Sequence, residues 1–394
     1  MTPHGIVLKN CDLYAPEPLG MADLTILDGK FLSLNEDFST ALKLLGAEVK
    51  VIDCEGALVL PGLVDAHVHF GGAGGEGGAV YRTPPLQLSE LTSAGITSAV
   101  GLLGTDGYCR SLRELLMKAR ALEEEGLSTW IFTGSYQIPG PTITGDVASD
   151  ILLIDKVIGL KLACSDHRAS QVPVQDLQKA AAESRVGGIL AGKCGLVMVH
   201  IGEGEKRLEP FLDIASHSDI PLSQFIPTHL NRSESVFQQA ISYGLAGGRV
   251  DISSGVSESC CFPGAVKPSR AAARLLEAGV PLKNVTMSSD GNGVMTRIDS
   301  ETGEKLPLMA PVHSMIDEFL DMLKEEMPVE KASRICSANM AEALRLPGCK
   351  GHIQFGGDAD LIVVDKSLKL RHVIAKGSVM FFDAVALRKG LFEK

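Results

Sequence analysis

The sequence lacks the long hydrophobic runs and basic blocks that mark several large classes of protein. No apolar stretch reaches the roughly 18 residues of a membrane-spanning helix, and the first 14 residues do not combine a basic segment with an apolar one. We therefore expect neither membrane association nor a secretory signal peptide. Because the formal net charge is −11 and Lys/Arg clusters are missing, we also expect no nucleic-acid partner.

Paired cysteines and aromatic residues are also scarce. The nine cysteines are an odd number and form no C-x-x-C motif, so we expect reduced thiols in a cytoplasmic protein. The adjacent Cys260 and Cys261 are interpreted as two free thiols in a loop. Only 5% of residues are aromatic whereas 42 are glycine, a composition that favours many short strand–loop–helix units.

What the sequence does contain is a repeated alternation of strand-like and helix-like segments. Such alternation is typical of parallel strands joined by helices, and eight strands favour a closed ring over an open sheet. The fold class predicted is therefore α/β, a (β/α)8 barrel of the TIM type. Its predicted strands are residues 63–70, 96–102, 129–135, 157–163, 195–201, 225–229, 249–253 and 284–289. Its predicted helices are residues 111–125, 174–185, 205–216, 234–244, 268–278, 313–326 and 329–344.

The two chain ends share a different sequence pattern, in which short β-like runs are separated by turn residues. These runs are residues 5–9, 23–27, 31–34 and 49–53, and again 359–364, 373–375 and 379–382. We predict that residues 1–60 and 346–394 together form a small β-sandwich domain, and that residues 61–345 form the barrel.

Polar residues end several predicted barrel strands, where barrel enzymes place their active sites. His67 and His69 are two positions apart on the first strand, so both side chains point the same way and can chelate a metal ion. Lys161 lies among apolar residues of the fourth strand, where burial would depress its pKa. The resulting neutral amine can take up carbon dioxide as a carbamate that bridges two metal ions. The fifth, sixth and eighth strands end in His200, His229 and Asp290.

Each of these residues, taken alone, has an ordinary structural interpretation. An H-x-H pair or a single strand-end histidine can simply pack, and a strand-end lysine can extend its ammonium to solvent. Their joint placement at the ends of strands one, four, five, six and eight favours a binuclear metal site instead. His167, close to Lys161 in sequence, is a candidate for orienting a metal ligand.

The motif P-G-x-x-D-x-H-x-H at residues 61–69, with the later lysine, histidines and aspartate, resembles the amidohydrolase superfamily. Longer segments resemble its bacterial isoaspartyl dipeptidases; they are residues 72–78, 82–84, 100–106, 161–168, 182–188, 227–232 and 288–293. Two places depart from the family. Val294 stands where the family has a serine that contacts the substrate, and residues 255–268 also differ, so the preferred dipeptide stays open.

The resemblance implies hydrolysis of the isopeptide bond of β-aspartyl dipeptides by a hydroxide that bridges two zinc ions. His67, His69 and Asp290 would bind one zinc ion, His200 and His229 the second, and carboxylated Lys161 both. Asp290 would transfer the proton, and Tyr136 would polarise the carbonyl group. The implied substrate contacts are Glu76, Gly75, Thr105, Tyr136, Arg168 and Arg232. The resemblance also implies a homo-oligomer, for which an octamer is one form.

The charges of such a dipeptide agree with these residues. Two carboxylates and one amine are complemented by Arg168, Arg232 and Glu76. The main alternative is a ring-opening amidohydrolase of the dihydropyrimidinase or dihydroorotase type, which needs less anion-binding capacity. Residues 72–77 fit the dinucleotide-binding pattern G-x-G-x-x-G, but prolines at 84 and 85 follow where that pattern needs a helix. A non-catalytic scaffold would lack metal ligands, and all six are present.

Overall fold

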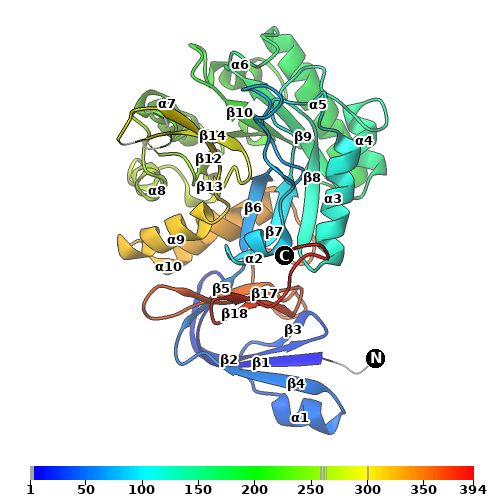
Figure 1. Ribbon diagram of the computed structural model, residues 1–394, viewed down its shortest axis with the longest axis vertical. Helices are drawn as coiled ribbons and strands as arrows, with labels where there is room; N and C mark the ends of the chain where they lie inside the picture. Colours follow the sequence, from blue (N-terminus) through cyan, green and yellow to red (C-terminus); the bar gives the residue numbers. More distant parts are fainter. Residues whose placement is uncertain (1–3, 258–259, 261, 263, 300) are drawn as a thin grey trace.

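Eight parallel strands form a ring in the computed structural model, which describes residues 4–257, 260, 262, 264–299 and 301–394 (Figure 1). Six are hydrogen-bonded in the order β11-β10-β9-β8-β7-β6, and β12 pairs with β13. The backbone N–H of His69 donates to the carbonyl of Gly291 at 2.9 Å, which joins the end of β6 to the segment after β13. The strands are β6 (Leu63–Val68), β7 (Ile96–Gly101), β8 (Ser128–Gly134), β9 (Val157–Cys164), β10 (Leu196–Ile201), β11 (Phe225–Thr228), β12 (Val250–Ser253) and β13 (Val285–Ser288).

All eight predicted barrel strands are thus confirmed, each within two residues of its expected bounds. The predicted helices are confirmed as α3 (Leu112–Glu124), α5 (Val174–Ala191), α6 (Glu209–His217), α7 (Glu234–Leu245), α8 (Pro268–Glu277) and α9 (Ser314–Lys324). The helix expected at residues 329–344 instead comprises α10 (Val329–Ser333), a π-helical turn (Arg334–Ala338) and α11 (Asn339–Ala343). The sequence analysis did not predict α1 (Ser39–Leu44), α2 (Leu88–Thr92) or α4 (Val147–Leu153).

Side chains of the barrel strands divide between two hydrophobic layers. On β8, Trp130 and Phe132 belong to the cluster inside the ring, whereas Ile131 packs in the outer layer toward the helices. Met340 and Leu344 of the α11 segment join the inner cluster. Because close-packed layers on both sides fix the strands, the polar residues at their carboxyl ends are held by a rigid frame.

The two chain ends combine in one nine-stranded sheet. Its order is β19-β18-β17-β16-β5-β1-β2-β3, with β4 paired to β1. These strands are β1 (His4–Tyr14), β2 (Pro18–Leu27), β3 (Lys30–Ser33), β4 (Glu48–Asp53), β5 (Leu58–Pro61), β16 (Leu361–Val364), β17 (Leu370–Ala375), β18 (Ser378–Phe382) and β19 (Val385–Ala386). The expected sharing of strands between the chain ends is confirmed. The division of this sheet into two facing layers, and the domain limits, stay predictions.

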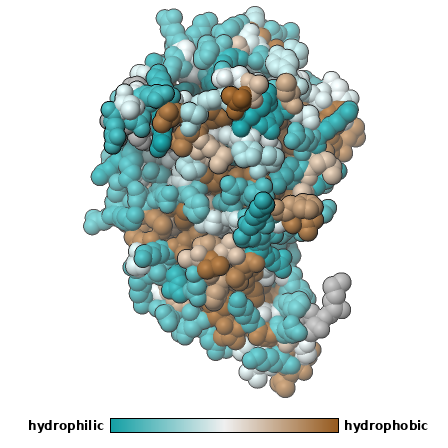
Figure 2. All heavy atoms as spheres, in the orientation of Figure 1, coloured by the Kyte–Doolittle hydropathy of each residue, from teal (hydrophilic) through white to brown (hydrophobic). Residues whose placement is uncertain are grey.

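The surface of these two parts differs in character. Figure 2 shows mostly hydrophilic residues over the barrel on this face and a concentration of hydrophobic residues over the nine-stranded sheet. Among the helices in the described part of the chain, none is long and apolar enough to cross a membrane. The eight cysteines that the structure describes are free thiols, as expected; Cys261 lies outside the described residues.

A short antiparallel hairpin follows the last barrel strand. It consists of β14 (Val294–Ile298) and β15 (Lys305–Met309), with Val294 opposite Met309. The sequence analysis did not predict this hairpin. Tyr81 lies just after the glycine-rich loop at residues 72–78. Its hydroxyl donates a hydrogen bond to the carbonyl oxygen of Met295 at 3.3 Å. The hairpin is therefore attached to a loop at the open end of the barrel.

Candidate metal centre and active-site pocket

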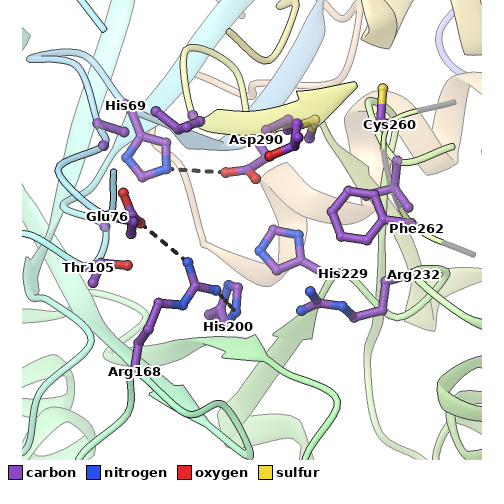
Figure 3. A pocket seen from close by; sticks show the side chains of 18 of the residues that line it. His69, Glu76, Thr105, Arg168, His200, His229, Arg232, Cys260, Phe262 and Asp290 are labelled. Carbon is purple, nitrogen blue, oxygen red and sulfur yellow. Dashed lines mark hydrogen bonds and ion pairs between the residues drawn. The ribbon is translucent and has the colours of Figure 1, made fainter. Parts of the chain in front are cut away.

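A cavity of about 310 Å³ lies at the carboxyl ends of the barrel strands (Figure 3). Its lining combines residues that lie on or just after all eight barrel strands with the glycine-rich loop and the β14–β15 hairpin. Nine of the twelve residues that the sequence predicted for the site line it: His69, Glu76, Thr105, Tyr136, Arg168, His200, His229, Arg232 and Asp290. The cavity is therefore where the predicted residues can act together.

The side chains of His67, His69 and Asp290 converge on one another. Oδ1 of Asp290 lies 3.3 Å from Nε2 of His67 and 3.2 Å from Nε2 of His69. The three potential ligand atoms lie within 4.8 Å of one another, close enough to hold one metal ion. Asp290 has a positive φ of 55°, a conformation that costs a non-glycine residue about 1–2 kcal/mol. Such strain is typical of residues held in place for function.

Lys161 lies next to this cluster and is completely buried. Its Nζ atom is 3.4 Å from Nε2 of His67 and 5.7 Å from the centre of the Tyr136 ring. Burial lowers the pKa of Lys161 to about 7, although the negative charges of Asp290 and Asp251 act to raise it. A substantial fraction of this lysine is therefore a neutral amine near neutral pH.

His200 and His229 complete the ring of imidazoles. Their ring centres are 4.6 Å apart, and His229 lies 5.1 Å from His67. His229 has a positive φ of 64°, and its Nδ1 atom lies 2.6 Å from the hydroxyl of Ser253. In His200, Nδ1 lies 2.6 Å from the hydroxyl of Tyr136, and Nε2 lies 2.9 Å from the carboxylate of Asp166.

These residues fit a divalent metal ion in charge as well as in position. Burial, as the largest cause, holds the pKa values of His67, His200 and His229 well below the usual value. Neutral imidazole is the form that binds metals. For Asp290, burial acts to raise the pKa, but electrostatic interactions with His229, His69 and Lys161 outweigh it and lower the pKa. The set therefore offers neutral nitrogen donors beside an anionic oxygen donor.

The side of the cavity away from this cluster carries charged residues suited to an ionic substrate. Arg168 forms two hydrogen bonds with Asp166, at 2.9 Å and 2.8 Å, and Nη1 of Arg168 lies 3.3 Å from Oε1 of Glu76. Its guanidinium lies 5.3 Å from the Tyr136 ring. Figure 3 shows Glu76 and Arg168 together on one side of the cavity and Arg232 on another.

Arg232 approaches the cavity beside an aromatic residue. Its guanidinium lies 5.3 Å from the ring of Phe262, and its Nε atom is 3.3 Å from Glu203. Thr105 lines the cavity, and its buried hydroxyl has no hydrogen-bond partner among the described residues. Gly75 does not line it, although its neighbours Gly74 and Glu76 do.

Gly74 explains why this loop must be rich in glycine. Its φ is 97°, and a Cβ atom there would lie 2.2 Å from the carbonyl oxygen of Tyr81 and 2.8 Å from the side chain of Val294. Any larger residue would collide with the backbone, so the glycine allows the loop to approach the hairpin closely. The loop therefore serves the shape of the cavity, and no dinucleotide-binding helix follows it within the described residues.

Sequence reasoning missed two carboxylates that hold the site together. Asp166, not the predicted His167, contacts His200; the side chain of His167 is 88% exposed. Asp251 is buried on β12 and accepts hydrogen bonds from the hydroxyls of Thr228 and Thr286, each at 2.7 Å, and from Ser288. The sequence did contain a signal for each residue. Asp251 is an aspartate within an apolar strand, and Asp166 begins a D-x-R motif at the end of a strand.

Comparisons with known proteins agree with this architecture. Residues 58–382 match the amidohydrolase family. A beta-aspartyl dipeptidase from the thermophilic, keratin-degrading Fervidobacterium islandicum AW-1, solved in complex with a beta-Asp-Leu dipeptide, is 37% identical to this chain with a TM-score of 0.86. The alignment covers 97% of this chain and 98% of that one. The similarity expected from the sequence motifs is therefore confirmed.

More distant relatives share the fold or only a segment. Dihydropyrimidinase from Brevibacillus agri NCHU1002 is 16% identical with a TM-score of 0.67, and the alignment covers 98% of this chain and 97% of that one. An allantoinase from Desulfitobacterium hafniense (strain Y51) is 29% identical over 107 residues, which are 23% of this chain and 22% of the allantoinase. The match thus spans about a fifth of that relative's length, whereas the match to the dipeptidase spans nearly all of both chains.

Proposed function

The chain belongs to the amidohydrolase family of TIM-barrel-type hydrolases, and we propose that it hydrolyses the isopeptide bond of β-aspartyl dipeptides with two zinc ions. The observation that carries this proposal is the lining of one cavity by Arg168, Arg232 and Glu76 together with four of the six candidate metal ligands. A β-aspartyl dipeptide carries two carboxylates and one ammonium group, and these three side chains complement its charges. The similarity to a beta-aspartyl dipeptidase over nearly the whole chain supports the same substrate class.

The metal ions would be held by residues from five barrel strands. His67, His69 and Asp290 would hold one ion, His200 and His229 the other, and Lys161, once carboxylated, would contact both. Two zinc ions, when bound, would supply Lewis acidity and lower the pKa of water toward about 7. The neutral amine of Lys161 attacks carbon dioxide and loses a proton, and the resulting carbamate has the negative charge and oxygen atoms that divalent cations prefer.

Substrate binding would use the charged side of the cavity. Glu76 would accept hydrogen bonds from the substrate ammonium group, exchanging its present contact with Arg168. The guanidinium groups of Arg168 and Arg232 would each face a carboxylate, for which their planar forks are suited. Asp166 keeps Arg168 oriented through two hydrogen bonds. The substrate's isopeptide carbonyl would then lie between Tyr136 and Asp290.

Tyr136 and Asp290 have complementary proton affinities. Burial raises the pKa of Tyr136 above its usual value, so its hydroxyl stays protonated and can donate to the carbonyl oxygen as negative charge develops there. Asp290 is ionised and can accept a proton from the attacking water. The carbon–nitrogen bond then breaks as Asp290 passes this proton to the leaving amine, which releases aspartate and a free amino acid.

The first test is hydrolysis of β-Asp-Leu beside α-Asp-Leu and dihydrouracil, with zinc and bicarbonate supplied. We expect turnover of β-Asp-Leu alone, because α-Asp-Leu places the scissile bond on the wrong carbonyl and dihydrouracil lacks the two carboxylates. Turnover of dihydrouracil without β-Asp-Leu would replace this proposal by the ring-opening alternative. Zinc measured by atomic absorption in the same samples distinguishes an unloaded protein from a wrong substrate.

The proposal also includes a homo-oligomer, with an octamer as one form, and a cytoplasmic location. Neither changes the residues assigned above. Light scattering on the zinc-loaded protein gives the particle mass directly, and a mass of about one chain would contradict the oligomer.

A further inference from the structure

One wall of the cavity takes no part in the chemistry proposed above. It is formed by Val294, Met295 and Thr296 of β14 and Lys305 of β15, which we call the hairpin wall. The wall stands beside Asp290, since β14 begins four residues after it. A substrate whose isopeptide bond reaches Asp290 therefore has one end close to these four residues.

The pairing of the two strands decides which side chains share a face. Successive side chains of a strand alternate, and directly opposed residues point to the same side. Position 298 is opposite Lys305 and two residues after Thr296, so Val294, Thr296 and Lys305 belong to one face. Met295 belongs to the other face, where it packs with Val256 and Ala310. Arg297 belongs to that second face too, is exposed and does not line the cavity.

Among the residues that the structure describes, Lys305 differs from Arg168 and Arg232 in having no anionic partner. Arg168 is engaged by Asp166 and Glu76, and Arg232 lies 3.3 Å from Glu203. For Lys305, no ion pair is formed within the described residues. In a chain with a net charge of −11, an unpaired ammonium group at a cavity rim is a local site for an anion.

We propose that the hairpin wall binds the amino acid released by the hydrolysis, and that Lys305 pairs with a carboxylate of that residue. The proposal rests on the proposed function, because only a dipeptide substrate has such a residue. Val294 would contact the apolar part of the released residue, and Thr296, on the same face, offers a hydroxyl beside Lys305. The carboxylate is either the α-carboxylate, present in every dipeptide, or the side chain of an acidic residue.

The experiment compares Lys305→Met with Arg297→Met in the zinc-loaded enzyme. Both variants remove one positive charge from the same hairpin, but only Lys305 lines the cavity. We measure kcat/KM at low salt on β-Asp-Leu, on β-Asp-Glu and on β-Asp-Leu with an amidated C-terminus. For Lys305→Met we expect a loss of about two- to fivefold, the range that exposed ion pairs give, mainly through KM. Arg297→Met should match the wild-type enzyme.

The three substrates distinguish the two sources of the carboxylate. A loss on β-Asp-Leu that disappears with the amidated substrate assigns Lys305 to the α-carboxylate. A loss confined to β-Asp-Glu assigns it to an acidic side chain. In both cases the loss should shrink at high salt, because exposed charges are screened.

Two outcomes would overturn the inference. One is an equal loss in both variants, which would show that only the net charge matters. The other is no loss on any substrate while the wild-type enzyme remains active. Either result leaves the proposed function in place, whereas a wild-type enzyme that cleaves no β-aspartyl dipeptide contradicts the proposed function itself.

Discussion

At the scale of single residues, burial sets the proton affinity of the candidate site. It lowers the pKa of Lys161 to about 7, lowers those of three imidazoles and raises that of Tyr136. Each change favours the uncharged form, as desolvation requires. A neutral amine can add carbon dioxide, a neutral imidazole can bind a metal ion, and a neutral phenol can donate a hydrogen bond. Asp290 differs, because its electrostatic interactions with His229, His69 and Lys161 outweigh burial and lower its pKa.

The ionised state of Asp290 leads to a direct prediction. Asp290→Asn keeps the size of the side chain but removes the proton acceptor, so kcat on β-Asp-Leu should fall by about 10²–10⁴-fold, as for other lost general bases. Circular dichroism should show an unchanged fold. Because Asp290 also lies among the candidate ligands, zinc content is measured in the same sample. A near wild-type rate with zinc bound would exclude this role.

Lys161 gives a second prediction, which is independent of turnover. Zinc uptake by the wild-type protein should increase with bicarbonate, because the carbamate adds a charged ligand. Lys161→Met, of similar size, should take up less zinc and lose the bicarbonate response. Lys156→Met is the matched control: burial lowers the pKa of Lys156 to about 8, but it pairs with Glu123 outside the cavity. A bicarbonate response that survives in Lys161→Met would rule out the carbamate.

At the scale of secondary-structure elements, the sequence predicted the barrel better than the segments around its mouth. Barrel strands are buried apolar runs bounded by turn residues, and that local pattern sets their limits. The β14–β15 hairpin was missed because β14 has only five residues with no regular apolar–polar alternation and β15 contains Pro307. The helix expected at 329–344 is interrupted by a π-helical turn, since the spacing of apolar residues does not reveal a change in hydrogen-bond register.

Local sequence patterns also predicted only part of the candidate site. Residues that end a strand could be identified one strand at a time, which is why the predicted metal ligands gather around one cavity. Asp166 and Asp251 act by contacting residues on other strands, His200 in one case and Thr228, Thr286 and Ser288 in the other. Those contacts depend on which strands become neighbours, so only the folded chain reveals them.

Asp251 offers a stability prediction at this scale, because it lies on β12 and connects this strand to β11 and β13. Asp251→Ala removes the shared acceptor of three buried hydroxyls, and we expect the free energy of unfolding to fall by about 2–4 kcal/mol. Asp155→Ala, which removes an exposed carboxylate near Arg120, should change it by about 0.5 kcal/mol or less. Urea denaturation measures both. A loss for Asp251→Ala no larger than for the control would contradict the connecting role.

At the scale of the whole molecule, the candidate active site and the nine-stranded sheet lie at opposite ends of the barrel. β5 of the nine-stranded sheet leads directly into the start of β6, whereas the cavity lies at the carboxyl ends of the strands. Figure 1 shows the sheet beyond the end of the barrel at which β6 begins. The candidate ligands lie within β6, β9 and β10 or just after β6, β11 and β13, so they are distributed around the ring. Any ion that binds them connects distant parts of the chain.

This distribution predicts that metal binding stabilises the entire fold. An ion that binds only the folded state adds about 2.7 kcal/mol when its concentration is 100 times its Kd, so a chelator should lower the midpoint of thermal unfolding by several degrees. Zinc should restore the midpoint in proportion to the logarithm of its free concentration. Magnesium should not, because a set rich in imidazole suits zinc and magnesium prefers oxygen ligands. An unchanged midpoint in protein stripped of metal, as verified by atomic absorption, would show that the ion does not bind the folded chain preferentially and would contradict the candidate metal site.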